Sequence, residues 1–195
     1  HKQDYEAHLL APTRALGEQV YEALHAAFPK EPFLLKLSRI YRDARRLHGN
    51  GPYKDHLWFC VRAGGEDWTG RPTFYFEIGP DYYSYGMGFW APKAALMEAY
   101  RKAVDEHPEV LEKLVKRFNK QAQFTLSGPE YARKKTAPSP LLAAWYNKKS
   151  INLQHDAAPD ERMFSPELAQ DIIEGFRTLM PLYKYFDALC AAEMV

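Results

Sequence analysis

The chain has 195 residues and a formal net charge of +1, with 46% hydrophobic and 26% charged residues, as in a globular protein. This charge argues against a protein that coats nucleic acid by bulk electrostatics, and no apolar run approaches the roughly 20 residues that span a bilayer. A chain of this length can bury a core without disulfides, so we expect a single domain over residues 1–195. Because the chain begins with His1 instead of Met, we expect this domain to be incomplete at its N-terminus.

The N-terminal half predicts one helix followed by an antiparallel meander. In residues 4–28 apolar side chains recur at about 3.6-residue spacing, with Pro12 as a flaw in the helical pattern. Alternating apolar residues predict four strands, at residues 33–42, 55–62, 72–78 and 82–90. Short connections require the last three strands to be antiparallel neighbours, and we expect the first strand to join them.

The predicted meander has two chemically different faces. One face is apolar and suited to packing by helices: Leu57, Phe59, Val61, Phe74, Phe76 and Ile78. The other is mixed: His56, Trp58, Cys60, Thr73, Tyr75 and Glu77. If Ser84, Gly86 and Gly88 share the mixed face, their small side chains leave room for a ligand. The alternative is that a further helix or loop covers this face.

The C-terminal half predicts helices and two short strands. Pro92 and Pro108 fit the first turns of two helices. Ser165-Pro166-Glu167 begins a third helix, which Pro181 should kink or end. Short strands are expected at 122–127 and 148–154, the second on an edge, with a loop at 128–140 between them. The sequence therefore predicts an α+β fold, an antiparallel sheet with a meander of about four strands plus short edge strands, packed by helices from the N-terminus, middle and C-terminus.

Motifs of the common cofactors do not occur in the sequence. We find no phosphate-binding loop, no G-x-G-x-x-G turn, no G-x-S-x-G elbow, no H-E-x-x-H and no paired C-x-x-C. Gly86-x-Gly88 lies inside a predicted strand and indicates close packing. We therefore predict no cofactor and no metal site. Cys60 and Cys190 lie in apolar surroundings, which is typical of buried thiols in a reducing compartment, so we expect a cytoplasmic protein.

The densest chemistry lies between Arg39 and His56, in the stretch RIYRDARRLHGNGPYKDH. Strand alternation places Arg39 on the face that leads into the core margin. A guanidinium there cannot lose its charge and needs an acceptor, for which Asp43 and Glu77 are the candidates. If the flanking strands pair, Tyr53, Lys54 and His56 converge on the arginines.

Three functional hypotheses are open for this stretch. The first is binding of an anionic or phosphorylated small molecule, because guanidinium forks bind two oxygens at once; its ligand-binding residues would be Arg39, Arg42, Arg45, Tyr53, Lys54 and Glu77. The second is a hydrolase or transferase with His56 or Asp43 as general base. The third is a structural or interaction domain in which the arginines form salt bridges. We expect neither nucleic acid nor a membrane as a partner.

The same stretch resembles the signature R-x-x-R-D-x-R-F-x-x-x-K-x-P-Y of a bacterial family of conserved proteins of unknown function (DUF family 2461). Arg46 stands where the signature has Phe and Asn50 where it has Lys, and the matching residues are Arg39, Arg42, Asp43, Arg45, Pro52 and Tyr53. DYEAHLLAP, FYFEIGPDYYSYGMGFWAP and FRTLMPLYKYFDAL are similar to family segments in family order. The resemblance implies one cytoplasmic, bacterial-type domain with a further stretch before His1. It implies no particular activity, substrate or cofactor.

Overall fold

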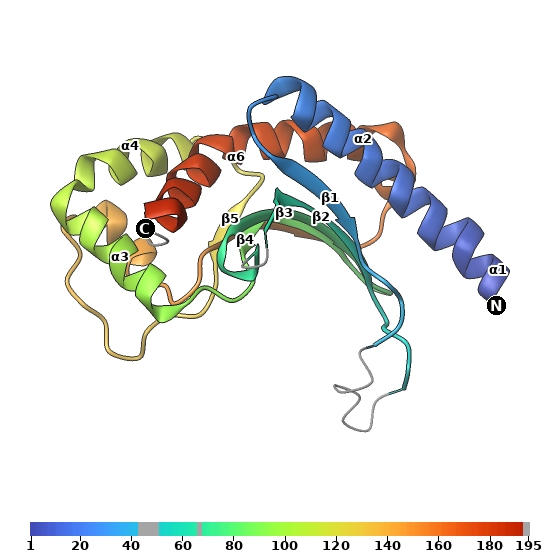
Figure 1. Cartoon of the computed structure of the whole chain (residues 1–195), viewed down its shortest axis with the longest axis horizontal. Helices are drawn as coiled ribbons and strands as arrows, with labels where there is room; N and C mark the ends of the chain where they lie inside the picture. Colours follow the sequence, from blue (N-terminus) through green and yellow to red (C-terminus); the bar gives the residue numbers. More distant parts are fainter. Residues whose placement is uncertain (43–50, 66–67, 193–195) are drawn as a thin grey trace. The chain divides into compact units, whose positions relative to one another are not determined.

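The structure is a computed structural model that describes residues 1–42, 51–65 and 68–192. It has the predicted α+β fold, with helices from the N-terminus, the middle and the C-terminus (Figure 1). The helical segments are α1 (Lys2–Tyr5), η1 (Glu6–Leu10), α2 (Ala11–Ala27), η3 (Trp68–Gly70), α3 (Ala94–Glu106), α4 (Pro108–Phe118), η4 (Pro140–Leu142), α5 (Ala143–Tyr146), η5 (Glu161–Phe164) and α6 (Pro166–Ala192). The strands are β1 (Phe33–Leu37), β2 (Leu57–Ala63), β3 (Pro72–Ile78), β4 (Tyr83–Phe89), β5 (Thr125–Ser127) and β6 (Asn152–Ala157).

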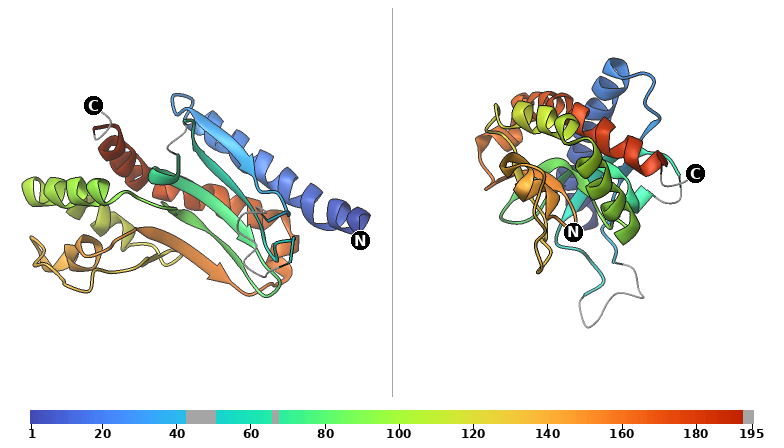
Figure 2. Two further views of the ribbon diagram at one scale, coloured as in Figure 1. Left: turned by 60° about the horizontal axis from the view of Figure 1, so that its bottom comes forward. Right: turned by 90° about the vertical axis from the view of Figure 1, so that its left-hand side faces the viewer.

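The strands form one antiparallel sheet in the order β1-β2-β3-β4-β6-β5. Figure 2 shows β1, β2, β3 and β4 side by side, as the predicted meander requires. The chain divides into two compact units, which are described separately below. Unit 1 comprises His1–Gly64, Phe74–Tyr85 and Asp156–Glu174, and unit 2 comprises Gly65–Thr73, Gly86–His155 and Gly175–Val195.

Unit 1 begins with the predicted N-terminal helix. The expected span of 4–28 is helical almost throughout, as α1, η1 and α2. The middle piece, η1, is a π-helical turn that ends two residues before Pro12. Proline has no backbone N–H to donate to the helical ladder, and π-helical turns occur as local interruptions of α-helices. The irregularity therefore lies next to the residue that the sequence marks as a flaw.

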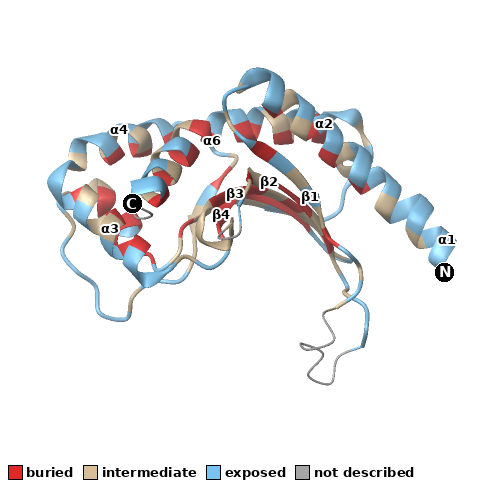
Figure 3. Cartoon of the chain, viewed as in Figure 1, coloured by how far each residue is buried: buried red, intermediate tan, exposed pale blue. Residues whose placement is uncertain are grey.

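The core of unit 1 lies between α2 and the apolar face of the meander. Val20 and Leu24 on α2 are fully buried, and Figure 3 shows the buried positions of α2 facing the sheet. Gly17 allows close approach, because a Cβ there would lie 3.2 Å from Phe59 Cγ. On the sheet, the Phe59 and Phe76 rings stack with centroids 5.4 Å apart. The predicted helix-packing face is confirmed.

The first strand is shorter than predicted. β1 pairs with β2 from Phe33↔Ala63 to Leu37↔Phe59, and the expected strand to residue 42 is wrong beyond this point. Ser38 makes a last pair of bonds with Trp58, donating from its N to Trp58 O (2.8 Å) and accepting at Oγ from Trp58 N (3.0 Å). Pairing resumes at an isolated bridge between Tyr41 and Tyr53. We call the segments that extend β1 and β2 beyond their paired ends the first arm (residues 38–42) and the second arm (residues 52–56). Five residues separate Tyr53 from Phe59 but only three separate Leu37 from Tyr41, so the chain bulges on the side of the second arm.

In unit 2 the close approach of two strands explains Gly86 and Gly88. A Cβ on Gly86 would lie 2.0 Å from the carbonyl oxygen of Leu153, and one on Gly88 would lie 2.0 Å from Asn152 Oδ1. The indicated close packing is therefore confirmed, and β6 fills the room that was expected for a ligand. The predicted edge position of 148–154 is wrong, because β6 lies between β4 and β5.

The predictions for the three helix-associated prolines of unit 2 agree with the structure to different degrees. Pro108 is the first residue of α4, as predicted, whereas α3 begins at Ala94 and leaves Pro92 before the helix. The prediction for Pro181 was that it kinks the helix or ends it, and the structure excludes the second outcome, because α6 continues past Pro181. Both neighbours of Pro181 are buried, Met180 and Leu182 at 3% exposure each. We attribute the continuation to this packing, which offsets the missing hydrogen bond.

Two further features bear on the sequence expectations. Cys60 and Cys190 are buried and unpaired, as predicted. Within the described ranges, no helix has both the length and the apolar character needed to cross a bilayer.

Candidate functional site

The predicted site residues that the structure describes lie in unit 1, with Glu77 on β3 and the others beyond the paired ends of β1 and β2. They are Arg39, Arg42, Tyr53, Lys54, His56 and Glu77. Asp43 and Arg45 lie outside the described residues, as do Arg46, His48 and Asn50. The site is therefore built here without the connecting segment 43–50.

Arg39 does not run into the core margin, which corrects the prediction. Strand alternation fails after Leu37, because Ser38 is buried at 5% exposure and turns Arg39 outward. The Arg39 side chain is exposed and needs no buried acceptor. Among the described carboxylates, none lies within ion-pair distance of it.

Arg42 connects the two arms. Its Nε donates a hydrogen bond to the carbonyl oxygen of Tyr53 (2.8 Å), and its Nη2 lies 3.6 Å from Asp55 Oδ1. The backbone supports this contact, since Arg42 N donates to Pro52 O (2.8 Å). The adjoining Tyr41 and Tyr53 rings contact each other with centroids 5.3 Å apart. The guanidinium is thereby held in one place at the base of the arms.

Asp55 is the site residue that sequence reasoning missed. Its Oδ1 lies 2.9 Å from His56 Nδ1 and also faces Arg42. The hydrogen bond from His56 is the main cause of a lowered pKa for the Asp55 carboxyl, with a smaller contribution from the charge of Arg42. The signal was present in the sequence, because Asp55 is one of only two acids in a strongly basic stretch.

The environment of Lys54 reflects the local excess of positive charge. Its Nζ lies over the Trp58 ring, 5.7 Å from the centroid, in a cation–π contact. The pKa of the Lys54 ammonium is lowered by partial burial first, and then by the charges of Arg42 and Arg39. Glu77 acts in the opposite direction but does not cancel the effect. Arg39 and Arg42 therefore lie close enough to Lys54 for their charges to disfavour its ammonium form.

Glu77 is not the hydrogen-bond acceptor of Arg39 that was predicted. Its Oε1 accepts a hydrogen bond from the Tyr82 hydroxyl instead. Gly79 makes this possible, because a Cβ there would lie 2.2 Å from Tyr82 Cε1, where the ring crosses the turn. Burial and the Glu77 carboxylate together raise the pKa of the Tyr82 phenol.

The mixed face of the meander continues from Lys54 across the sheet. The Tyr75 hydroxyl and Ser84 Oγ lie 3.2 Å apart, so Ser84 shares the face of Tyr75, a point that the sequence left open. Burial raises the pKa of Tyr75 to about 12, so its hydroxyl stays protonated at neutral pH. The site thus places the Lys54 ammonium beside an indole, and the Tyr75 and Ser84 hydroxyls form a separate polar pair on the meander.

The available groups limit the chemistry of this site. No three His, Cys, Asp or Glu side chains of the described residues gather closely enough to bind a metal ion. The cations can bind phosphate or carboxylate oxygens. The Asp55–His56 pair fixes one imidazole nitrogen and leaves the other for proton transfer.

Comparison with known proteins places the chain in a family. A family model described as conserved hypothetical protein (DUF2461) matches residues 1–185. The chain belongs to the DUF2461 family. A search of curated proteins found no match. The resemblance stated from the sequence is thus confirmed over nearly the whole chain, and the family description assigns no activity to the DUF2461 site.

Proposed function

We propose that unit 1 binds an anionic small molecule, of the phosphorylated or carboxylated metabolite class, at Arg39, Arg42 and Lys54. The observation that carries this proposal is the gathering of the three cations: after partial burial, the charges of Arg42 and Arg39 both lower the pKa of Lys54. Their two neighbouring carboxylates are already engaged, Asp55 by His56 and Glu77 by Tyr82.

The chemistry of the three cations suits such a ligand. Arg42 is fixed by Tyr53 O and by Asp55, so it presents a pre-oriented guanidinium to a bidentate anion. Arg39 is exposed and free to close over a ligand. Lys54 supplies a point charge beside Trp58, and a bound anion would relieve the repulsion it experiences.

Thermal-shift measurements test this proposal. Inorganic phosphate, phosphorylated metabolites and carboxylates are added to the wild type, to Arg39→Ala and to Lys54→Met, with Lys102→Met as control. Lys102 is an exposed lysine of α3 in unit 2, which pairs with Glu106 at 3.9 Å. A ligand at about 100 times its Kd stabilises the native state by about 2.7 kcal/mol.

We expect at least one of these anions to raise the Tm of the wild type and of Lys102→Met, and to raise it much less in Arg39→Ala and Lys54→Met. Equal shifts in all four proteins, or no shift with any anion, would remove the proposal.

A second candidate function is a hydrolase or transferase with His56 as general base, which the 2.9 Å contact between His56 Nδ1 and Asp55 Oδ1 favours. Asp43, the other candidate base, lies outside the described residues. Generic ester and phosphoester substrates are assayed with the wild type, His56→Gln and Lys102→Met. Turnover that His56→Gln alone abolishes supports the enzyme, and turnover equal in all three proteins contradicts it.

We also infer a cytoplasmic location, which the two buried, unpaired thiols support. Thiol titration of the denatured protein, isolated without reductant from its native host, should find both cysteines reduced. A disulfide between them would contradict this inference.

A further inference from the structure

Positive charge concentrates in one part of unit 2. Between Gly86 and His155 the sequence has twelve Lys and Arg residues against six Asp and Glu, although the whole chain carries only +1. Three of these cations are consecutive, in the segment Arg133-Lys134-Lys135 of the loop between β5 and η4. Residues 132–136 of this loop are all exposed. Long exposed loops are normally mobile. Whether this loop can form a binding site therefore depends on the hydrogen bonds that hold its backbone in place.

The first part of the loop is fixed by Lys148, which is 8% exposed. Its Nζ donates to the carbonyl oxygen of Gly128 (3.0 Å) and to Glu130 Oε1 (3.2 Å). The backbone adds a second tie, in which Lys149 N donates to Pro129 O (2.7 Å). The buried Lys148 side chain therefore fixes the position of the loop backbone and does not contribute to the exposed positive charge of the loop.

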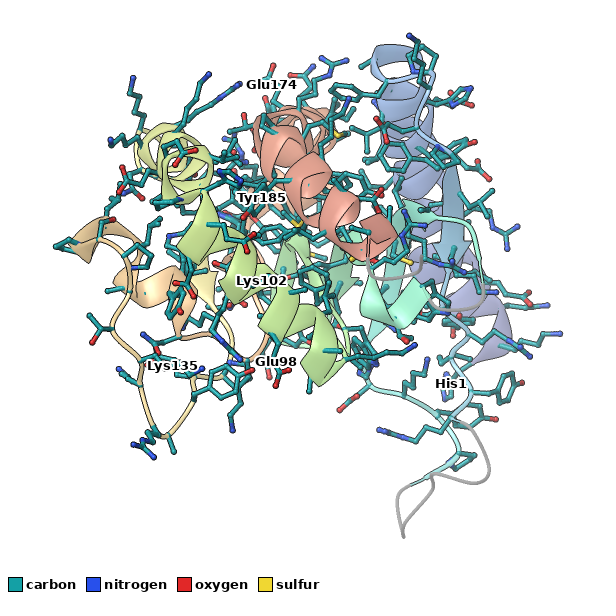
Figure 4. All side chains as sticks on the ribbon, turned by 60° about the vertical axis from the view of Figure 1, so that its left-hand side comes forward. His1, Glu98, Lys102, Lys135, Glu174 and Tyr185 are labelled. Carbon is teal, nitrogen blue, oxygen red and sulfur yellow. The ribbon has the colours of Figure 1, made fainter. Side chains whose placement is uncertain are left out.

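The basic segment itself is fixed by the buried side chain of Asn147. Its Oδ1 accepts from Lys135 N (2.9 Å), and its Nδ2 donates to Lys135 O (3.1 Å). The Asn147 backbone carbonyl also accepts from Tyr131 N (3.0 Å). One residue therefore brackets the segment on both sides, and the exposed cations project from a fixed backbone. Figure 4 labels Lys135 on this loop and Lys102 on α3.

Two more cations lie beside the segment, over the ring of Tyr131. The Arg101 guanidinium carbon is 4.6 Å from the ring centroid and Lys149 Nζ is 5.7 Å from it. Such contacts orient the cations while leaving their N–H groups exposed. We call the five residues Arg101, Arg133, Lys134, Lys135 and Lys149 the basic platform.

The basic platform is poorly neutralised. Glu130 pairs with Lys134 at 2.8 Å and with Lys148 at 3.2 Å, which lowers the pKa of the Glu130 carboxyl. No other carboxylate of the described residues lies within ion-pair distance of the platform. Four cations held on one fixed surface without counter-charges form a positive patch that suits an anionic partner with several charges.

We propose that the basic platform binds the phosphate backbone of double-stranded nucleic acid. Lysine and arginine contacts to phosphates supply sequence-independent affinity. A single strand is less suited, because it needs free aromatic rings for base stacking, and two cations already lie over Tyr131. The exposed large hydrophobic side chains of the described chain all lie outside residues 128–149, so the platform lacks the apolar centre of a protein interface and the apolar anchors of a membrane-binding surface.

Fluorescence anisotropy with a labelled DNA duplex of about 20 base pairs tests the proposal. The loop variant Arg133→Gln/Lys135→Gln is compared with the wild type and with the control Lys113→Gln/Lys120→Gln. The control removes the same charge from two exposed positions of the same unit, Lys113 on α4 and Lys120 just after its end. Circular dichroism checks that all three proteins are folded. Anionic vesicles and polyglutamate are measured as competing partners.

We expect the loop variant to weaken duplex binding at least about tenfold and to lower the salt slope of log K by about 0.9 for each lost phosphate contact. The control should change the affinity by less than about twofold. Equal losses in the loop variant and the control would show unspecific electrostatics and overturn the proposal. Absence of binding, or tighter binding to vesicles or polyglutamate than to the duplex, would overturn it as well.

Discussion

At the scale of single residues, the first two arginines of the Arg39–His56 stretch have different environments. Arg42 is held by Tyr53 O and Asp55, whereas Arg39 is exposed and has no described ion-pair partner. The structural hypothesis, in which arginines cement the fold, therefore applies to Arg42 more than to Arg39. Their roles can be separated by stability and by ligand binding.

Replacement of each arginine by alanine should separate the two roles. Arg42→Ala removes a hydrogen bond from a charged donor and should lower the free energy of unfolding by about 1–3 kcal/mol. Arg39→Ala should change it by less than about 0.5 kcal/mol, as is usual for surface positions. Urea denaturation provides the values. A larger loss in Arg39→Ala than in Arg42→Ala would mean that Arg39 has a structural role.

The lowered pKa of Asp55 predicts a dependence of stability on pH. Because the carboxyl is more acidic in the folded protein, its stabilisation is present above the unfolded pKa of about 3.9. The stabilisation is lost as the pH falls through the folded value. The wild type should therefore melt at a higher temperature than Asp55→Asn near neutral pH, and the difference should disappear in acid. A Tm difference that is the same at all pH values would be inconsistent with the contacts to His56 and Arg42.

At the scale of elements, periodicity and turn residues predicted the helices and the meander, because these features reflect burial on one face. The bulge between Tyr53 and Phe59 was not predictable, since it depends on a length mismatch with residues 38–40 and not on local alternation. Regular strand alternation does not continue past this mismatch, which is why the predicted direction of Arg39 is wrong. The interior position of β6 likewise depends on long-range pairing, to which a short polar strand gives no local signal.

The substitution Gly86→Ala tests the close packing of β4 against β6. A Gly→Ala change with compatible backbone angles normally stabilises by about 0.4–1 kcal/mol. At Gly86 the added methyl group meets the Leu153 carbonyl, and such overpacking should destabilise by about 1–3 kcal/mol. Gly51→Ala is the control, because a Cβ at Gly51 meets nothing within 4 Å. Denaturation midpoints should rank Gly86→Ala well below Gly51→Ala, and an equal rank would contradict the close approach.

Pro181 tests how α6 tolerates an internal proline. The helix lacks the hydrogen bond that a residue with an N–H would donate at this position, and an interior proline costs about 3 kcal/mol. Pro181→Ala should therefore raise the free energy of unfolding by up to about 3 kcal/mol. A loss of stability in calorimetry would show instead that the packing of α6 is adapted to the proline.

At the scale of the whole molecule, the net charge of +1 conceals local concentrations of opposite sign. The segment Gly86–His155 is strongly basic, whereas Asp156–Glu174 has six acids and one arginine. The expectation that nucleic acid is not a partner rests on the net charge of the whole chain. The proposal for the basic platform rests instead on the local charge of the segment Gly86–His155. The match to the DUF2461 family covers residues 1–185 and gives no information on whether nucleic acid is a partner.

The central claim, that Arg39, Arg42 and Lys54 form an anion site, is tested most directly by the pKa of the Lys54 ammonium. It can be measured by NMR of isotope-labelled lysine, with Lys54→Arg to assign the signal. We predict a pKa below the ordinary value of about 10.4 in the free protein, and a rise when inorganic phosphate or a phosphorylated ligand found by thermal shift is added. An ordinary pKa in the free protein, or a lowered one that no anion changes, would contradict the claim.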